Sequence, residues 1–166
     1  MTLYSDDAGK FDACTVAEQA TPPPPPPPPP PTASLLLNGG FELGLSDWQS
    51  CSDDGATQTV DDASEGNAAV QITGGDCLYQ EFAVEPNERY TLECDAKGTQ
   101  TLYTSATLSI MNAGYTSVAS DEQEVTSSDY QALSSTLDAP PTGAIGAVTL
   151  YSDDTGTFDA CRVGQP

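Results

Sequence analysis

The sequence predicts an all-β protein whose strands form a two-sheet antiparallel β-sandwich. Apolar residues recur at every second position in short runs, residues typical of turns separate these runs, and no helical periodicity persists for three turns. About ten such runs lie within the roughly 130 residues that follow a proline tract. So many short strands are typical of two packed sheets, each of which buries one face against the other.

The expected strands share an alternation that assigns one face of each strand to the core. In residues 89–94, for example, Tyr90, Leu92 and Cys94 lie on the same face. The last two strands are joined by residues 153–156, whose sequence Asp-Asp-Thr-Gly is typical of a hairpin turn. In chain order, the expected strands are 34–37, 57–60, 68–73, 77–84, 89–94, 104–111, 115–119, 130–137, 147–152 and 157–163.

Residues 2–16 nearly repeat residues 149–163. The aligned segments differ only at the pairs Ala8/Thr155, Lys10/Thr157 and Thr15/Arg162. We therefore expect residues 1–16 to be the closing β-hairpin of a preceding or neighbouring module, detached from the sandwich that follows. The residues expected to make its assembly contacts are Thr2, Leu3, Tyr4, Phe11 and Cys14.

A run of ten prolines at residues 22–31 separates this hairpin from the sandwich. Ten prolines in the polyproline II conformation form a rod of roughly 31 Å, at about 3.1 Å per residue. The tract is either a semi-rigid strut or a flexible low-complexity linker. The expected divisions are a hairpin at 1–16, a proline-rich linker at 17–33, the sandwich at 34–163 and the start of a further linker at 164–166.

The charge and composition exclude several classes of function. Twenty-five acidic residues against four basic ones give a net charge of −21, which repels nucleic acid and anionic lipid. Histidine is absent, which excludes Ser-His-Asp catalysis and His-ligated zinc, and we expect no enzyme activity. No apolar run is long enough for membrane insertion. Five cysteines without a CxxC motif indicate disulfides, and thus a secreted, extracellular or cell-surface protein.

Several short motifs follow one another in a characteristic order. The segment NGGFE at residues 38–42 precedes Gly44 and Trp48, and then come DASEGNAAV at 62–70, YQEFAVEP at 79–86 and FDA at 158–160. This order resembles the jelly-roll carbohydrate-binding modules of families 4 and 22, over nearly all of residues 34–163. The resemblance implies a jelly roll of two antiparallel sheets, no catalysis and, in many members, a structural calcium ion.

The resemblance also implies where calcium would bind. The matching positions are Glu42, the backbone around Glu65 and Asn67, and Asp159. Calcium takes about six to eight oxygen ligands, so carboxylates and carbonyls from separate segments suit it and would pin the two ends of the domain together. The alternative is that Glu42 and Asp159 are solvated or cap turns.

Modules of this kind bind glycans by stacking exposed aromatic rings on sugar rings. The single tryptophan, Trp48, matches a buried position of the family, so we expect it in the core. Tyr79, Tyr103, Tyr115 and Tyr130 are the candidates for a sugar-binding platform. Cross-strand packing would explain tyrosines equally well.

Cys14 is the counterpart of Cys161, so the sandwich itself has four cysteines, which allow three pairings. Because Cys94 points inward and Cys161 lies on the last strand, we predict a Cys94–Cys161 bond, which leaves Cys51–Cys77. Cys14 would then bond a Cys94 equivalent in another module or remain a free thiol.

Two functions fit these observations. The first is a non-catalytic structural or adhesive repeat that builds an extracellular fibre, stalk or filament, joined head to tail to other copies through the hairpin and the proline rod. The alternative is a carbohydrate-binding module of a secreted multidomain glycan-active protein, with a polysaccharide as its partner. Contacts of residues 2–16 with another copy would favour the first, and exposed coplanar tyrosines on one sheet face would favour the second.

Overall fold

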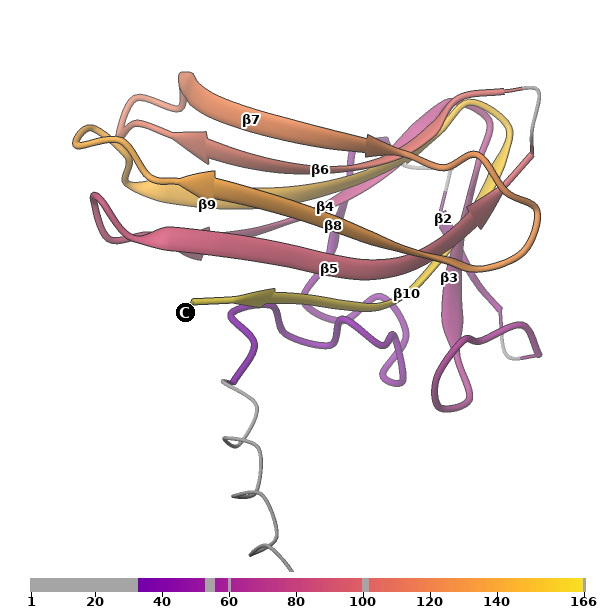
Figure 1. Cartoon of the computed structure of the whole chain (residues 1–166). Coiled ribbons are helices and arrows are strands. Elements are labelled where there is room, and N and C mark those ends of the chain that lie inside the picture. Colours follow the sequence, from indigo (N-terminus) through magenta and orange to yellow (C-terminus); the bar gives the residue numbers. More distant parts are fainter. Residues whose placement is uncertain (1–32, 53–55, 60, 100–101, 166) are drawn as a thin grey trace, which may run out of the picture. The chain divides into compact units, whose positions relative to one another are not determined.

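The computed structural model places the described residues in two antiparallel sheets (Figure 1). The described residues are 33–52, 56–59, 61–99 and 102–165. The chain divides into the units Met1–Pro30 and Pro31–Pro166, and all of these residues belong to the second. Within them, no helix has the length and apolarity of a membrane span. The predicted hairpin and almost all of the predicted linker lie outside the described residues, as do Thr2, Leu3, Tyr4, Phe11 and Cys14.

Each sheet has five described strands. The first, called sheet I, has the order β1 (Gln49–Ser50), β4 (Asp76–Ala83), β9 (Ile145–Ser152), β6 (Thr104–Met111) and β7 (Ser117–Glu124). The second, called sheet II, has the order β2 (Ala56–Thr59), β3 (Ala69–Thr73), β10 (Thr155–Gly164), β5 (Arg89–Gly98) and β8 (Gln131–Asp138). The predicted all-β jelly-roll sandwich is confirmed.

Alternation along each strand puts one row of side chains between the sheets. In β4, Leu78, Gln80 and Phe82 are buried, whereas Tyr79 and Glu81 are not. Burial of each large apolar side chain contributes about 1.5–3 kcal/mol to stability, so the core is the main reason for the fold. The largest fully buried side chains are Tyr90, Phe41, Phe158, Ile72, Leu78, Leu92, Leu108, Ile110, Leu150, Val70, Val148 and Val163.

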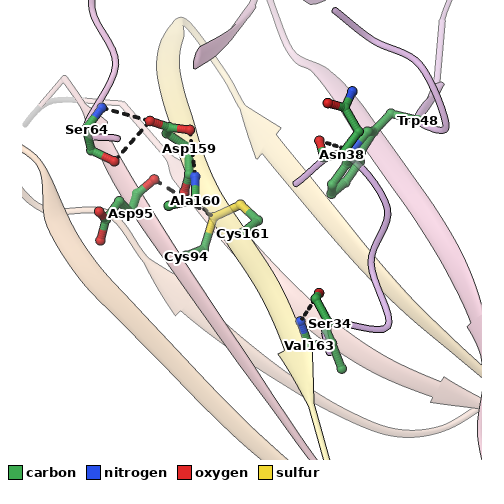
Figure 2. Close-up of a disulfide and its surroundings, with 10 residues drawn as sticks. All are labelled: Ser34, Asn38, Trp48, Ser64, Cys94, Asp95, Asp159, Ala160, Cys161 and Val163. Atoms are coloured by element: carbon green, nitrogen blue, oxygen red, sulfur yellow. Dashed lines mark hydrogen bonds between the residues drawn. A yellow bond between two sulfur atoms is a disulfide. The ribbon is translucent and has the colours of Figure 1, made fainter. Parts of the chain in front are cut away.

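Trp48 lies in this core, as the sequence predicts. The side chain is buried, and its ring centroid lies 5.2 Å from that of Phe41. Its Nε1–H donates a hydrogen bond of 3.2 Å to the Asn38 carbonyl (Figure 2). The indole therefore anchors the segment before β1 and is not available to a ligand.

The predicted hairpin turn at residues 153–156 is wrong. Strand β9 pairs with β4 and β6 in sheet I, whereas β10 pairs with β3 and β5 in sheet II. The two strands cannot pair with each other because each already has a partner on both sides. The connection crosses from one sheet to the other, held by an Asp153 N–H bond of 2.8 Å to the Tyr103 carbonyl.

Residues 34–37 are also not a strand. Leu35 donates to the Val163 carbonyl of β10 over 2.8 Å, but the next donors turn elsewhere. The Leu36 N–H bonds the Ser34 hydroxyl and the Leu37 N–H bonds the buried Gln80 side chain, so no ladder continues along β10. Two smaller differences remain. Strand β1 was not expected, and β7 starts later than predicted because residues 112–116 form a turn.

Both predicted disulfides of the sandwich are present. Cys94–Cys161 joins β5 to β10 within the core, where the two residues are 3% and 4% exposed (Figure 2). Cys51–Cys77 joins β4 to the residue that follows β1, and its Cys51 is exposed. Each bond restricts the unfolded chain and contributes about 2–4 kcal/mol.

Candidate functional site

Three tyrosines gather on the outer face of sheet I, which is turned away from sheet II. Alternation places Tyr79 of β4 and Tyr151 of β9 there, because the residue before each is a fully buried leucine. Tyr103 directly precedes Thr104, the buried first residue of β6. Tyr79, Tyr103 and Tyr151, all half-buried, are called the tyrosine face below.

The tyrosine face is continuous across neighbouring strands. The ring centroids of Tyr103 and Tyr151 lie 6.0 Å apart, and the rings are tilted by 51°. Such tilted pairs attract each other. In the register of β4 and β9, Tyr151 is opposite Cys77 and Tyr79 is opposite Thr149. Tyr79 and Tyr151 are therefore diagonal neighbours, which lie about 7–8 Å apart in a sheet.

Glu122 of β7 supplies a carboxylate beside these rings. Its Oε1 accepts hydrogen bonds from the Ser105 hydroxyl at 2.8 Å and the Thr107 hydroxyl at 3.2 Å. It also accepts a hydrogen bond from Tyr103, which is the main cause that lowers the pKa of Glu122. Burial, followed by this hydrogen bond, raises the pKa of Tyr103. Glu122 is thus an anion held in place by the hydroxyls of Ser105 and Thr107, beside Tyr103, with acceptor capacity left for a ligand.

The other two tyrosine hydroxyls are also oriented. Tyr79 donates a hydrogen bond of 3.0 Å to Gln49 Oε1 of the edge strand β1. Tyr151 donates to Asp153 Oδ1, and this bond is the main cause that raises the pKa of Tyr151. Rings fixed at their hydroxyls offer a ligand their faces and edges in a set orientation, which reduces the entropy cost of binding.

The two sheets differ in charge. Every described basic residue lies on sheet II: Arg89 and Lys97 in β5, and Arg162 in β10. Each forms an ion pair, with Asp138, Asp62 and Glu93 respectively. In the described strands of sheet I, the outer face carries Glu81, Glu122 and Glu124 and no base. The tyrosine face therefore has a negative potential.

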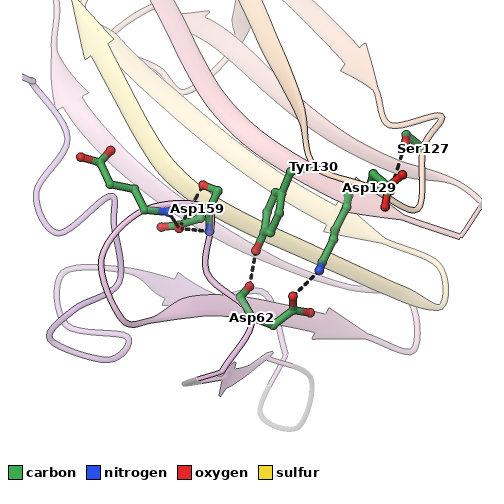
Figure 3. Close-up of polar contacts among 8 residues, drawn as sticks. Asp62, Ser127, Asp129, Tyr130 and Asp159 are labelled. Atoms are coloured by element: carbon green, nitrogen blue, oxygen red, sulfur yellow. Dashed lines mark hydrogen bonds and ion pairs between the residues drawn. The ribbon is translucent and has the colours of Figure 1, made fainter.

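The four tyrosines predicted for sugar binding do not lie together. Tyr79 and Tyr103 belong to the tyrosine face. Tyr115, 64% exposed, lies in the turn after β6, so an eight-residue strand of roughly 26 Å separates it from Tyr103. Tyr130 directly precedes β8 of sheet II, and Lys97 Nζ lies 4.5 Å above its ring. The Tyr130 hydroxyl donates to the Asp62 carbonyl (Figure 3). Burial is the main cause that raises the pKa of Tyr130.

Tyr151 was not among the predicted residues, although the sequence contains a signal for it. In residues 147–152, the alternation of Val148 and Leu150 with Thr149 and Tyr151 places Tyr151 outward. What the sequence could not show was that β9 lies in the middle of sheet I, next to both β4 and β6.

The predicted calcium residues meet at one loop. Asp159 is fully buried, and its Oδ2 accepts hydrogen bonds of 2.8 Å from the backbone N–H groups of Ser64 and Glu65 and one of 3.1 Å from the Ser64 hydroxyl (Figure 2). Glu42 Oε1 accepts from the N–H groups of Asn67 and Ala68, and the Asn67 bond is the main cause that lowers the pKa of Glu42.

This donor set resembles a calcium site only in part. Carboxylates from the two ends of the domain reach the same loop, as calcium binding requires, but the oxygens described above face N–H donors. No group of three or more His, Cys, Asp or Glu residues in the described part of the chain could hold a metal ion. Calcium binding at Glu42, Glu65, Asn67 and Asp159 therefore stays a prediction.

A cavity of about 380 Å³ lies beside this loop, and another of about 220 Å³ adjoins β5 and β8. Both are lined by Glu65, Ala160 and Arg162. Neither includes a residue of the tyrosine face, so the two regions are separate candidates for ligand binding.

The two antiparallel five-stranded sheets form the jelly-roll fold of carbohydrate-binding modules. Residues 33–156 match the family model described as "Carbohydrate binding domain", and the chain belongs to this family. No curated protein sequence matches the chain.

Solved structures share the fold. Family 16 Carbohydrate Binding Module-2 has a TM-score of 0.68 and 18% identity, over 78% of this chain and 99% of that one. The CBM22-1–GH10 modules of Clostridium thermocellum endo-1,4-β-D-xylanase 10B, complexed with xylohexaose, have a TM-score of 0.65 and 15% identity. That match covers 81% of this chain and 29% of the xylanase chain. The enzymatically active domain of tailspike protein 4 of bacteriophage CBA120 has a TM-score of 0.69 and 14% identity, over 80% of this chain and 21% of that one. This chain spans only about a fifth of that tailspike chain and under a third of that xylanase chain.

Proposed function

We propose that the protein is a secreted, non-catalytic carbohydrate-binding module that holds a polysaccharide chain on the tyrosine face. The observation that carries the proposal is the pair of Tyr103 and Tyr151, with ring centroids 6.0 Å apart, beside the oriented carboxylate of Glu122. Membership of the carbohydrate binding domain family supports this function over that of a structural filament. The two disulfides require an oxidising compartment and so support secretion.

The chemistry of the face suits a sugar chain. The C–H faces of sugar rings pack against aromatic rings, and a carboxylate accepts charge-assisted hydrogen bonds from sugar hydroxyls. Tyr103 and Tyr151 are half-buried and tilted by 51°, so the exposed coplanar tyrosines expected of a sugar platform are not found in this pair. Each ring would instead contact a different sugar of a twisted chain. An open sheet face also lets a long polymer run past both ends of the site.

The charge of the face narrows the ligand to neutral glycans. Glu81, Glu122 and Glu124 would repel polymers rich in uronic acid or sulfate. We expect calorimetric titration to show binding to a neutral oligosaccharide such as xylohexaose or cellohexaose, and none to polygalacturonate.

Tyr151→Ala should weaken this binding by about tenfold or more, because loss of one stacking ring costs about 1.5 kcal/mol. Tyr115→Ala is the matched control, since that ring is exposed but lies at the far end of β6. Equal affinity of wild type and Tyr151→Ala for every bound glycan would contradict the proposed site, and absence of binding to any glycan would contradict the function.

Calcium is a separate proposal, supported by the two carboxylates that reach the 64–68 loop. A bound ion would stabilise the folded state by mass action. We expect calcium to raise the unfolding temperature relative to a sample in EDTA, and Glu42→Gln to remove the difference. Identical temperatures in calcium and EDTA would leave hydrogen bonding as the only role of these carboxylates.

The sequence repeat favours a second function, in which copies of the module join head to tail. Residues 149–163 form the end of β9 and most of β10, the middle strands of the two sheets. Residues 2–16 carry nearly the same sequence, which is the support for other copies as partners. Sedimentation of the full chain and of a chain lacking residues 1–16 tests this: the full chain should oligomerise and the shortened chain should not. A monomeric full chain at all concentrations would contradict the second function.

A further inference from the structure

The Cys51–Cys77 disulfide lies on the same outer face of sheet I as the tyrosines. In the register of β4 and β9, Cys77 is directly opposite Tyr151. On the other side of β4, Gln49 is opposite Tyr79, and the Cys51 N–H donates a hydrogen bond of 2.9 Å to the Cys77 carbonyl. The disulfide and Tyr151 are therefore neighbours in one row across the sheet, and Gln49 and Tyr79 lie in the next row.

The strand that the disulfide fixes is anchored by the core only on the side of Trp48, the buried residue directly before it. Strand β1 consists of Gln49 and Ser50 alone, lies at the edge of sheet I and exposes both side chains. A two-residue edge strand makes too few ladder hydrogen bonds to stay in register on its own, and its unpaired edge is open to water. Side-chain hydrogen bonds to β4 come from two pairs: Tyr79 donates to Gln49, and Ser50 donates to Asp76 over 3.3 Å.

The second disulfide has a different position and role. Cys94 and Cys161 belong to the apolar core and join the middle strand of sheet II to its neighbour. Cys51 and Cys77 do not belong to that core. Loss of the Cys51–Cys77 bond should therefore release the β1 edge without opening the sandwich.

We propose that the Cys51–Cys77 disulfide is a positioning element of the glycan site. It holds β1 in register, so that the Gln49 carboxamide orients the Tyr79 ring and itself lies at the rim of the face, where its N–H₂ and carbonyl can bond sugar hydroxyls. Without the bond, Tyr79 loses its oriented partner and the ligand must order the β1 edge as it binds, which lowers affinity. The inference rests on the proposed function of the tyrosine face.

The first test compares glycan affinity in wild type, in Cys51→Ser/Cys77→Ser, in Gln49→Ala and in the triple variant. The double serine variant should bind about three- to tenfold more weakly than wild type, as should Gln49→Ala. In the triple variant, Gln49→Ala should cause little further loss, because its partner strand is already released. Full additivity would show that the disulfide does not act through β1 and would overturn the proposal.

A matched control separates positioning from general destabilisation. Tyr103→Ala should reduce affinity by the same factor with and without the Cys51–Cys77 bond, since Tyr103 is oriented by Glu122 and not by β1. Circular dichroism at the titration temperature checks that every variant is folded. Unchanged affinity in the double serine variant would also overturn the inference.

A second measurement requires no glycan. Amide hydrogen exchange should speed up in the double serine variant at residues 49 and 51, whose N–H groups face β4, while the amides of β5 and β10 keep their protection. If the wild type binds no glycan, the proposed function fails, and with it the binding part of this inference. If the wild type binds and exchange at residues 49 and 51 is the same with and without the bond, the proposed function stands and the inference alone fails.

Discussion

Asp159 is a carboxylate without exposed surface, and hydrogen bonds from Ser64, Glu65 and Ala160 surround it. These bonds join the last strand to the loop before β3. The sequence indicated that Asp159 and this loop would meet, because both match the family pattern. It could not indicate that backbone N–H groups would face the carboxylate, since that depends on the conformation of the loop.

Asp159→Asn should destabilise the protein by about 2–3 kcal/mol, because an amide N–H₂ would replace an oxygen that accepts charge-assisted hydrogen bonds. Urea unfolding measures the loss. Asp138→Asn is the control: that carboxylate pairs with Arg89 at the surface, where solvent screens the pair, so its loss should cost clearly less than that of Asp159. Equal losses for the two variants would contradict the role given to Asp159.

The lowered pKa of Glu42 predicts that the stability of the protein depends on pH. The N–H groups of Asn67 and Ala68 lower its pKa from the usual 4.5 in the folded state, so folded Glu42 stays charged at a pH where the unfolded chain already binds a proton. Its contribution to stability is complete above the ordinary pKa and is lost as the pH falls through the lowered one. Urea unfolding between about pH 6 and about pH 3 should show a weaker dependence in Glu42→Gln than in wild type. The same slope in both would contradict this.

At the scale of elements, the loop at residues 64–68 depends on one glycine. Gly66 has φ of +69°, and a Cβ there would lie 2.1 Å from Glu42 Oε1. Gly74 has nearly the same φ, +71°, but open space around it. Alanine substitutions at Gly66 and Gly74 therefore share the cost of backbone strain, and only the one at Gly66 adds a steric clash.

Gly66→Ala should destabilise the protein more than Gly74→Ala, which carries only a backbone cost of about 1–2 kcal/mol. Adding Glu42→Ala should reduce the excess in Gly66→Ala, because the clash disappears with the carboxylate. Thermal unfolding of the three variants provides the comparison. Equal destabilisation by the two glycine substitutions would show that the loop moves away from Glu42 at no cost.

The elements themselves were largely predictable, because a period of two in apolar residues is a local signal. Strands β3 to β6 and β8 to β10 were expected within a few residues. The pairing of β9 and β10 was not, since a turn sequence between two strands is the same whether they share a sheet or cross between sheets. Residues 34–37 have a strand-like pattern, yet Ser34 and Gln80 take the hydrogen bonds that a ladder would need.

At the scale of the whole molecule, the charge of −21 is the dominant feature. The described bases are all engaged in ion pairs on sheet II, so the remaining acids repel one another. The Debye length falls from about 10 Å at 0.1 M salt to about 3 Å at 1 M, which screens this repulsion.

The unfolding temperature should therefore rise as NaCl increases from about 0.02 M to about 1 M, across which the screening length shortens severalfold. A variant with Glu81→Gln and Glu124→Gln should show a smaller rise, because part of the repulsion has been removed. A temperature that stays constant or falls with salt would contradict the electrostatic account.

The sequence predicted the residue types of the candidate site but not which of these residues lie together. Tyrosines and a sheet face were expected, and Tyr79 and Tyr103 belong to the face. Tyr130 was placed with them because a sequence does not show which sheet the following strand joins. Tyr115 was placed with them because the turn at residues 112–116 was not expected. Tyr151 was missed because the sequence does not show that β9 lies between β4 and β6, and Glu122 because the expected strand ended at residue 119.

The most direct test of the glycan-binding claim is NMR chemical-shift mapping of the labelled protein during titration with a neutral hexasaccharide that it binds. We expect the largest shifts at Tyr79, Tyr103, Tyr151 and Glu122 on the outer face of sheet I, with little change at Tyr130, which precedes β8, and at Arg162 of β10. Shifts concentrated around Arg162 and the cavities that it lines, with the tyrosine face unchanged, would contradict this expectation.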